Sequence, residues 1–130
     1  MVIAVAAEKR DPDPVVSSYF GRSSCFVLVN TENEIQEVVE NPYAQSLGDG
    51  GIQSAQMLIE RNIDAVIADR VGMNALRILS AADVRVYRCA GTSAREALRL
   101  FLDGNLERVI SPANGAGKRR RRRFAKRNWK

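Results

Sequence analysis

The second half of the chain alternates short apolar runs with stretches of helical periodicity, and this alternation constrains the fold more than any other feature. Apolar residues recur at helical spacing in residues 52–61, in residues 72–81 and again after Ser93, while residues 64–69 and 84–89 have the pattern of short strands. Strands that alternate with helices in this way pair in parallel, and the helices cover the sheet. The alternation therefore predicts an α/β domain.

Three further strands are expected before the first helix. Residues 1–7 form a continuous apolar run with Val and Ile, which is typical of a buried central strand, and residues 23–30 form a second run. Residues 35–40 suit a third strand, and the short polar turn before them predicts an antiparallel hairpin. The order β-β-β-α-β-α-β-α predicts a ribonuclease-H-like three-layer α/β/α fold: a five-stranded mixed sheet, with the first strand central and helices on both faces.

The third helix has the clearest local signals. Ser93 and Glu96 stand at the spacing of a capping box, in which each side chain binds a backbone N–H group of the other residue. A continuous apolar stripe follows, formed by Ala94, Ala97, Leu98, Phe101 and Leu102. Gly104 is well placed to end the helix in the left-handed conformation.

The formal charge of +5 divides the chain into two unequal parts. Residues 118–130 hold nine of the 20 Lys and Arg residues and none of the 15 Asp and Glu residues, so this segment is +9 and the rest of the chain is −4. Blocks of like charge seldom fold and commonly act as interaction arms. The sequence therefore predicts one α/β domain over residues 1–111 and a basic, disordered C-terminal tail over residues 112–130.

The tail is a candidate binding site for a polyanion. Its cations would displace counterions from phosphate groups, and Phe124 or Trp129 could stack on an unpaired base. The candidate polyanion-binding residues are Arg119, Arg120, Arg121, Arg122, Arg123, Lys126 and Arg127. A nucleic acid, a membrane surface or an acidic protein would each satisfy this charge, and a solvated appendage without a partner is the remaining alternative.

Missing and scarce residue types exclude several classes of site. The chain has no histidine, which rules out Ser–His–Asp and Cys–His catalysis and any histidine zinc site. Cys25 and Cys89 are too few and too far apart for a disulfide framework, so both are expected to be buried thiols, with metal binding as the weaker alternative. No apolar run approaches the roughly 20 residues of a membrane span, and a cytoplasmic protein is expected.

Three loops carry candidate binding residues. Arg22 could hold an anion through its guanidinium group, and Gly21 would let the backbone approach a ligand closely. An ion pair between Arg22 and a carboxylate of the domain is the alternative. The pair Gly50-Gly51 leads into the first helix and the pair Gly91-Thr92 into the third, where unpaired N–H groups suit an anion. Turn formation and helix capping explain these two pairs without any ligand.

Short motifs follow one another in a fixed order over about the first 110 residues. They are the strand at residues 1–7, Phe20-Gly21-Arg22, Asn41-Pro42, Asp64-Ala65-Val66-Ile67-Ala68 before Gly72, Val84-Arg85-Val86-Tyr87 before Gly91-Thr92, then Ala97-Leu98, Phe101 and Gly104-Asn105-Leu106. The ordered set resembles the nitrogenase iron–molybdenum cofactor biosynthesis and accessory proteins, the NifX and NifB C-terminal type. This resemblance implies a ribonuclease-H-like fold and a non-enzymatic protein that binds or carries an iron–sulfur or iron–molybdenum cofactor precursor, with a cofactor-assembly protein as partner.

The resemblance also implies a set of site residues, with two departures from the family pattern. The implied cofactor-binding residues are Tyr19, Gly21, Arg22, Gly50, Gly51, Gly91 and Thr92. Members of the family commonly have a histidine where this chain has Tyr19, and often have histidines or a cysteine in the loop after Asn41-Pro42, where this chain has neither. Because iron–sulfur clusters need thiolate or imidazole ligands, the identity of the cofactor and of any metal ligand stays open.

Two other functions are alternatives to a carrier. Nucleases with a ribonuclease-H-like fold hold their metal ions with carboxylates, one of them on the first strand, and residues 1–7 contain no acidic side chain. An enzyme is therefore not expected. The alternative is an interaction module, in which the domain is a scaffold and the basic tail binds nucleic acid or another polyanion.

Overall fold

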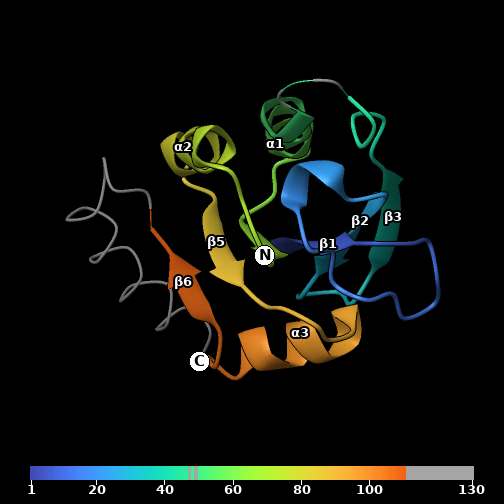
Figure 1. The fold of residues 1–130 in the computed structure, drawn as a ribbon. Helices are drawn as coiled ribbons and strands as arrows, with labels where there is room; N and C mark the ends of the chain where they lie inside the picture. The colour runs from blue at the N-terminus through green and yellow to red at the C-terminus, as the bar shows by residue number, and fades with distance from the viewer. Residues whose placement is uncertain (47, 49, 111–130) are drawn as a thin grey trace.

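The computed structural model describes residues 1–46, 48 and 50–110, which form one mixed sheet with helices on both faces (Figure 1). In chain order the elements are β1 (Val2–Ala7), the single 3-10 turn η1 (Phe20–Arg22), β2 (Cys25–Asn30), β3 (Gln36–Glu40), α1 (Gly50–Glu60), β4 (Ala65–Ala68), α2 (Met73–Ala81), β5 (Arg85–Arg88), α3 (Ala94–Leu102) and β6 (Glu107–Val109). None of the helices in these described ranges is long and apolar enough to cross a membrane. The predicted tail over residues 112–130, with its candidate polyanion-binding residues, lies outside them.

The strands lie in the order β3-β2-β1-β4-β5-β6, so β1 is inside the sheet, as predicted. β1 is antiparallel to β2 and parallel to β4, and Ile3 of β1 lies opposite Ala65 of β4. β2 and β3 form the predicted antiparallel hairpin, and β4 and β5 are parallel. The carboxyl ends of β1, β4 and β5 therefore meet at one edge of the sheet, where α/β folds commonly bind ligands.

The prediction of five strands is wrong, because a sixth strand, β6, pairs antiparallel with β5. β6 has three residues, Glu107-Arg108-Val109, which is too few for an alternating pattern and contains no apolar run. Backbone pairing with the free side of β5 forms this strand, and β-structure depends on such neighbours more than on intrinsic preference. The fold of the described residues is a six-stranded mixed α/β sheet with three helices.

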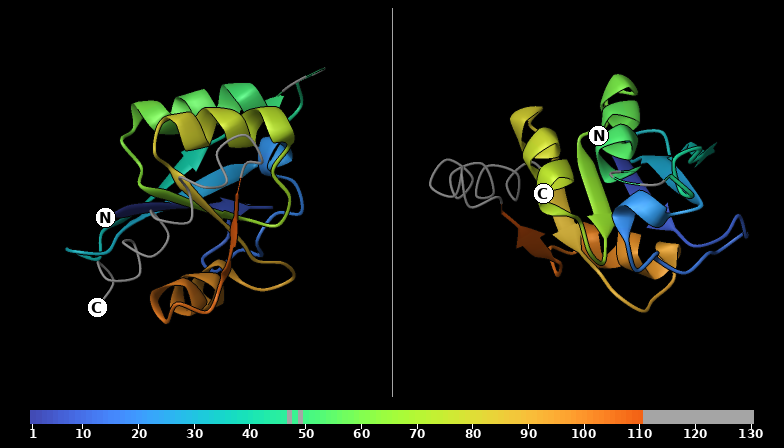
Figure 2. Two further views of the ribbon diagram at one scale, coloured as in Figure 1. Left: turned by 90° about the vertical axis from the view of Figure 1, so that its left-hand side faces the viewer. Right: turned by 45° about the horizontal axis from the view of Figure 1, so that its top comes forward.

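The two faces of the sheet bury two separate apolar clusters. Along β1, Ala4 and Ala6 belong to the cluster beneath α1 and α2, whereas Ile3 and Val5 belong to the cluster beneath α3. This alternation follows from the two-residue period of a strand. Figures 1 and 2 show α1 and α2 side by side on one face and α3 on the other. Both faces of β1 are therefore buried, as its continuous apolar sequence predicts.

The start of α3 confirms only half of the predicted capping box. The hydroxyl of Ser93 accepts a hydrogen bond from the N–H of Glu96 at 3.1 Å. The carboxylate of Glu96 instead accepts a hydrogen bond from Arg99 at 3.0 Å, and this bond lowers the pKa of the Glu96 carboxyl. Gly104, just after the helix, has a φ of 77°, the left-handed conformation that the sequence predicts there.

Candidate functional site

The loop after β1 ends in a firmly anchored turn. The hydroxyls of Ser17 and Ser23 both donate hydrogen bonds to the carbonyl oxygen of Tyr19, at 3.0 and 3.1 Å. Phe20, the first residue of η1, is almost completely buried, and its ring centroid lies 5.3 Å from that of Phe26 on β2. The turn η1 is therefore held by the core on one side and by hydroxyl groups on the other.

The backbone of η1 lies directly against the first turn of α1. A Cβ atom at Gly21 would lie 2.6 Å from the nitrogen of Gly51, and a Cβ atom at Gly50 would lie 2.7 Å from the carbonyl oxygen of Tyr43. Both distances are shorter than any real contact of this kind. Close backbone packing therefore requires glycine at Gly21 and Gly50, and this packing brings two of the predicted binding loops together.

A hollow of about 170 Å³ opens where η1, the loop after β3, the start of α1 and the loop after β4 meet. We call it the η1–α1 pocket. The described residues that line it are Tyr19, Phe20, Gly21, Arg22, Tyr43, Ala44, Ser46, Gly48, Gly50, Gly51, Arg70 and Gly72. Five of the seven predicted cofactor-binding residues are therefore neighbours: Tyr19, Gly21, Arg22, Gly50 and Gly51.

The described lining of the η1–α1 pocket is cationic. Arg22 and Arg70 are the two charged side chains in it, and neither forms an ion pair with any carboxylate among the described residues. The alternative to anion binding by Arg22 is an ion pair with a carboxylate of the chain. The described part of the chain contains no such ion pair. Guanidinium groups bind the oxygen atoms of anions through planar, directional hydrogen bonds. The arrangement suits an anionic ligand.

The other two predicted cofactor-binding residues lie outside this pocket. The carbonyl oxygen of Thr92 accepts a hydrogen bond from the N–H of Val16 at 2.8 Å, and Val15 forms an isolated β-bridge with Ser93. Gly91 has a φ of 68°, a left-handed conformation that favours glycine. These contacts explain Gly91 and Thr92 as turn residues that lead into α3.

Both cysteines are free and buried, as predicted. Cys25 shares the α3 side of the sheet with Val27 and Val29, and its sulfur donates a weak hydrogen bond to the carbonyl oxygen of Lys9 at 3.6 Å. Burial raises the pKa of the thiols of Cys25 and Cys89. The residues that the structure describes contain no group of three His, Cys, Asp or Glu side chains that could hold a metal ion.

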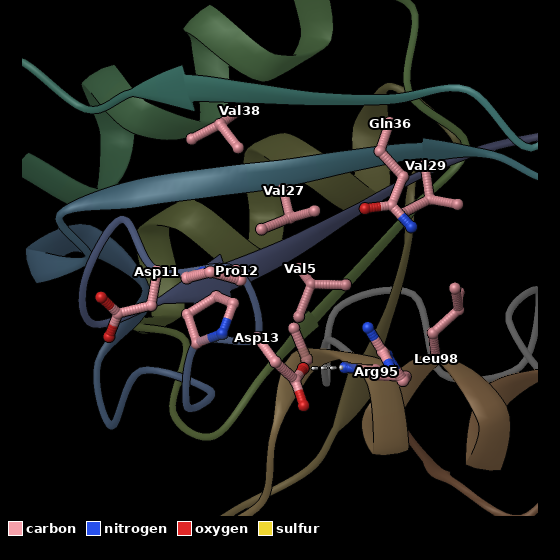
Figure 3. A pocket seen from close by; sticks show the side chains of 12 residues that line it. Val5, Asp11, Pro12, Asp13, Val27, Val29, Gln36, Val38, Arg95 and Leu98 are labelled. Atoms are coloured by element: carbon pink, nitrogen blue, oxygen red, sulfur yellow. Dashed lines mark hydrogen bonds between the residues drawn. The ribbon is translucent and has the colours of Figure 1, made fainter.

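A second, smaller hollow of about 80 Å³ lies between α3 and the hairpin of β2 and β3 (Figure 3). Figure 3 shows Val27, Val29 and Val38 as its apolar wall. Asp13, on the loop after β1, accepts a hydrogen bond from the backbone N–H of Arg95 at 3.1 Å, which joins this loop to α3. None of the predicted site residues lines this hollow.

The predicted cofactor-binding residues do not include Arg70 and Tyr43, which the structure places in the pocket lining. Arg70 follows the carboxyl end of β4, and this position is a general signal for ligand binding in α/β folds. Tyr43 reaches the pocket because the loop after β3 packs on the first turn of α1, where the carbonyl oxygen of Tyr43 would lie 2.7 Å from a Cβ atom at Gly50.

The described residues form a small α/β fold with a cationic pocket near the carboxyl ends of β1 and β4. The chain belongs to the dinitrogenase iron-molybdenum cofactor family, whose profile matches residues 1–104. The match confirms the family that the ordered motifs indicate. It spans every described element except β6.

Relatives of known structure share the fold over nearly their whole length. The orange protein of Desulfovibrio gigas, solved in its apo form, is 34% identical, with 85% of this chain and 94% of that chain covered and a TM-score of 0.80. The Thermotoga protein TM1290, provisionally named as a NifB protein, is 36% identical, with 82% and 91% covered and a TM-score of 0.73. A relative matched by sequence alone, the Methanocaldococcus jannaschii protein MJ0580, is 32% identical over 96 residues, 72% of this chain and 81% of its own.

Proposed function

We propose that the chain is a non-enzymatic protein that binds and carries a metal–sulfur cofactor precursor, of the kind for which its family is named, in the η1–α1 pocket. The observation that supports this most directly is the guanidinium of Arg22. It is exposed, it has no carboxylate partner among the described residues, and it lies in a pocket built from two predicted binding loops. A cofactor-assembly protein is the partner that such a carrier would need.

The lining of the pocket supports recognition of an anion rather than direct binding to a metal. Its described residues include no thiol, imidazole or carboxylate group, the ligands that iron prefers in proteins. A cluster that already has its own sulfide or oxide ligands needs no further bond from the protein. Such an anion can be held by guanidinium groups and by the N–H groups at the start of α1.

One relative supports a carrier. The orange protein has a solved apo form, so this relative folds without a bound group, and we propose the same for this chain and its cargo. We also assign the strand order β3-β2-β1-β4-β5, with helices on both faces, to the ribonuclease-H-like class. A nuclease is not proposed, because β1 has no acidic residue to hold a metal ion.

Anaerobic incubation with tetrathiomolybdate, a preformed and coloured metal–sulfide dianion, followed by gel filtration and visible absorption, tests the carrier function. The wild-type chain should elute with molybdenum, sulfide and the chromophore in a fixed ratio. Arg22→Ala should lose this material, whereas Arg77→Ala, which removes an exposed arginine of α2 outside the pocket, should keep it. A colourless wild-type protein, or equal loading of the two variants, would contradict the proposal.

A further inference from the structure

Tyr19 and Arg70 are held side by side by the backbone, although they are 51 residues apart in sequence. The N–H of Phe20 donates to the carbonyl oxygen of Arg70 at 2.8 Å, and the N–H of Arg70 donates to the carbonyl oxygen of Ser18 at 3.1 Å. These bonds make Tyr19 and Arg70 partners in a parallel β-bridge. The loop after β1 and the loop after β4 are thereby joined at one rim of the η1–α1 pocket.

The two side chains also contact each other. The guanidinium carbon of Arg70 lies 5.6 Å from the centroid of the Tyr19 ring, and its Nη1 lies 3.4 Å from the phenol oxygen. Tyr19 is 52% exposed, a large fraction for an aromatic residue. An arginine stacked on an aromatic face loses fewer conformations when it binds an anion, because its guanidinium plane is already oriented.

The acidic residue next to Arg70 in sequence is engaged elsewhere. Asp69 forms an ion pair with Arg88 of β5, with an Nε–Oδ1 distance of 3.2 Å, and its side chain is only 18% exposed. Arg70 is therefore left without a carboxylate partner among the described residues, on a chain whose domain is acidic. Its charge is available to a ligand on the side that carries the Tyr19 ring.

We propose that Arg70 is the second anion-binding residue of the η1–α1 pocket and that Tyr19 is its positioning residue. The ligand class is then an anion with a charge of at least two, contacted through outer oxygen or sulfur atoms by Arg22 and Arg70 together, without a bond between protein and metal. This inference rests on the proposed function, because it assigns the residues and the ligand charge of the same site. Tyr19 acts on the ligand only through the orientation of Arg70.

Titration calorimetry of the full chain with molybdate, a divalent oxyanion, tests the role of Arg70. Arg70→Ala should weaken binding by about tenfold or more, since hydrogen bonds to charged groups are worth about 1.5–3 kcal/mol. The matched control is Arg77→Ala, which removes the same charge from an exposed position outside the pocket and leaves the basic tail unchanged. Equal affinities of the two variants would overturn the proposal, and so would absence of molybdate binding to the wild-type chain.

The role of Tyr19 is tested by a conservative and a disruptive variant. Tyr19→Phe keeps the ring that carries the guanidinium and loses only the long contact to the phenol oxygen, so binding should fall less than about twofold. Tyr19→Ala removes the ring and should weaken binding by about threefold to tenfold, while the midpoint of thermal unfolding stays the same because the side chain is exposed. If Tyr19→Ala in the Arg70→Ala background weakens binding by the same factor as in the wild type, Tyr19 does not act through Arg70.

The two proposals fail in different ways. If the wild-type chain takes up the tetrathiomolybdate chromophore and Arg70→Ala binds molybdate as tightly as Arg77→Ala, the carrier function stands and the role of Arg70 is wrong. If the wild-type chain stays colourless but molybdate binding depends on Arg70, the anion site stands and the carrier function is wrong.

Discussion

Arg22 and Cys25 lie three residues apart, and their surroundings give them opposite chemistry. Arg22 is exposed at the η1–α1 pocket and has no described carboxylate partner. Cys25 is 1% exposed, and burial raises the pKa of its thiol. By residue type the cysteine would be the better ligand for iron. Because Cys25 is buried and Arg22 is exposed, the group that a ligand can reach is the cation and not the thiol.

Both thiols should resist alkylation in the folded chain. Burial raises the pKa of Cys25 and of Cys89 above the ordinary value of 9.0, so little of the reactive thiolate exists at pH 8. Mass spectrometry after treatment with iodoacetamide at pH 8 should find both residues unmodified. The same chain in urea is the control and should be modified twice. Rapid modification of the folded protein would contradict the burial of these thiols.

The same thiols should make the chain less stable at alkaline pH. A group whose pKa is raised by folding holds its proton more tightly in the folded state, so its contribution is fully present below the unfolded pKa and is lost as pH rises. The midpoint of thermal unfolding should therefore decline as pH rises beyond 9.0, the ordinary value for cysteine. The decline should be smaller in a Cys25→Ala, Cys89→Ala double variant, and an identical decline would contradict this origin.

The candidate site depends on the contact between the turn η1 and the helix α1. Gly21 has no room for a side chain, because the nitrogen and Cα of Gly51 lie within 2.8 Å of where its Cβ would be. A shift of α1 would therefore change the shape of the pocket in which Arg22 lies. Packing of backbone on backbone explains the glycines and positions the arginine at the same time.

Gly21→Ala should destabilise the chain and weaken cargo binding. The added methyl group would push α1 away from η1, and such overpacking costs about 1–3 kcal/mol. Gly72→Ala is the matched control, because its Cβ would meet nothing within 4 Å and its φ of −61° suits alanine. Chemical denaturation should show a lower free energy of unfolding for Gly21→Ala only. Equal stability of the two variants would mean that the close approach is not tight.

The hydroxyl of Ser93 should contribute to the stability of α3. It accepts the N–H of Glu96, which would otherwise be unpaired at the start of the helix. Ser93→Ala should lower the free energy of unfolding by about 1 kcal/mol. Ser24→Ala, at an exposed position outside the helix, should leave it nearly unchanged. A loss of stability in both variants would argue against a specific cap.

Strands and helices with a strong local sequence pattern could be predicted from the sequence. A strand that forms only by pairing with a neighbouring strand could not. The apolar run of β1 and the cap and stripe of α3 are local signals, and both elements lie where they were predicted. β6 exists only because β5 offers it an unpaired edge. The candidate site shows the same difference. Arg22 could be predicted from the Phe20-Gly21-Arg22 motif, whereas Arg70 lies at the η1–α1 pocket because of a backbone bridge to Tyr19.

At the scale of the whole molecule, the described residues between Met1 and Val109 form two apolar clusters, one on each face of the sheet. Deletion of residues 112–130 should therefore leave the free energy of unfolding within about 0.5 kcal/mol of the full chain. The alternative function, binding of nucleic acid by the tail, predicts that the full chain binds single strands with an affinity that falls steeply with salt and that the deletion abolishes this binding. Retention of binding by the shortened chain would place the polyanion site on the domain instead.

One edge of β3 has no strand partner among the described residues. The acidic residues of β3 affect whether a strand from another molecule can pair with this edge. Glu37 points toward the α1 side, where it pairs with Arg61, and Glu40 points toward the opposite side, where it pairs with Arg10. A strand from a second molecule that extended the sheet here would meet paired charges on both faces. Charged edge strands oppose edge-to-edge aggregation in this way. The hairpin of β2 and β3 can therefore remain at the periphery of the sheet without recruiting another copy.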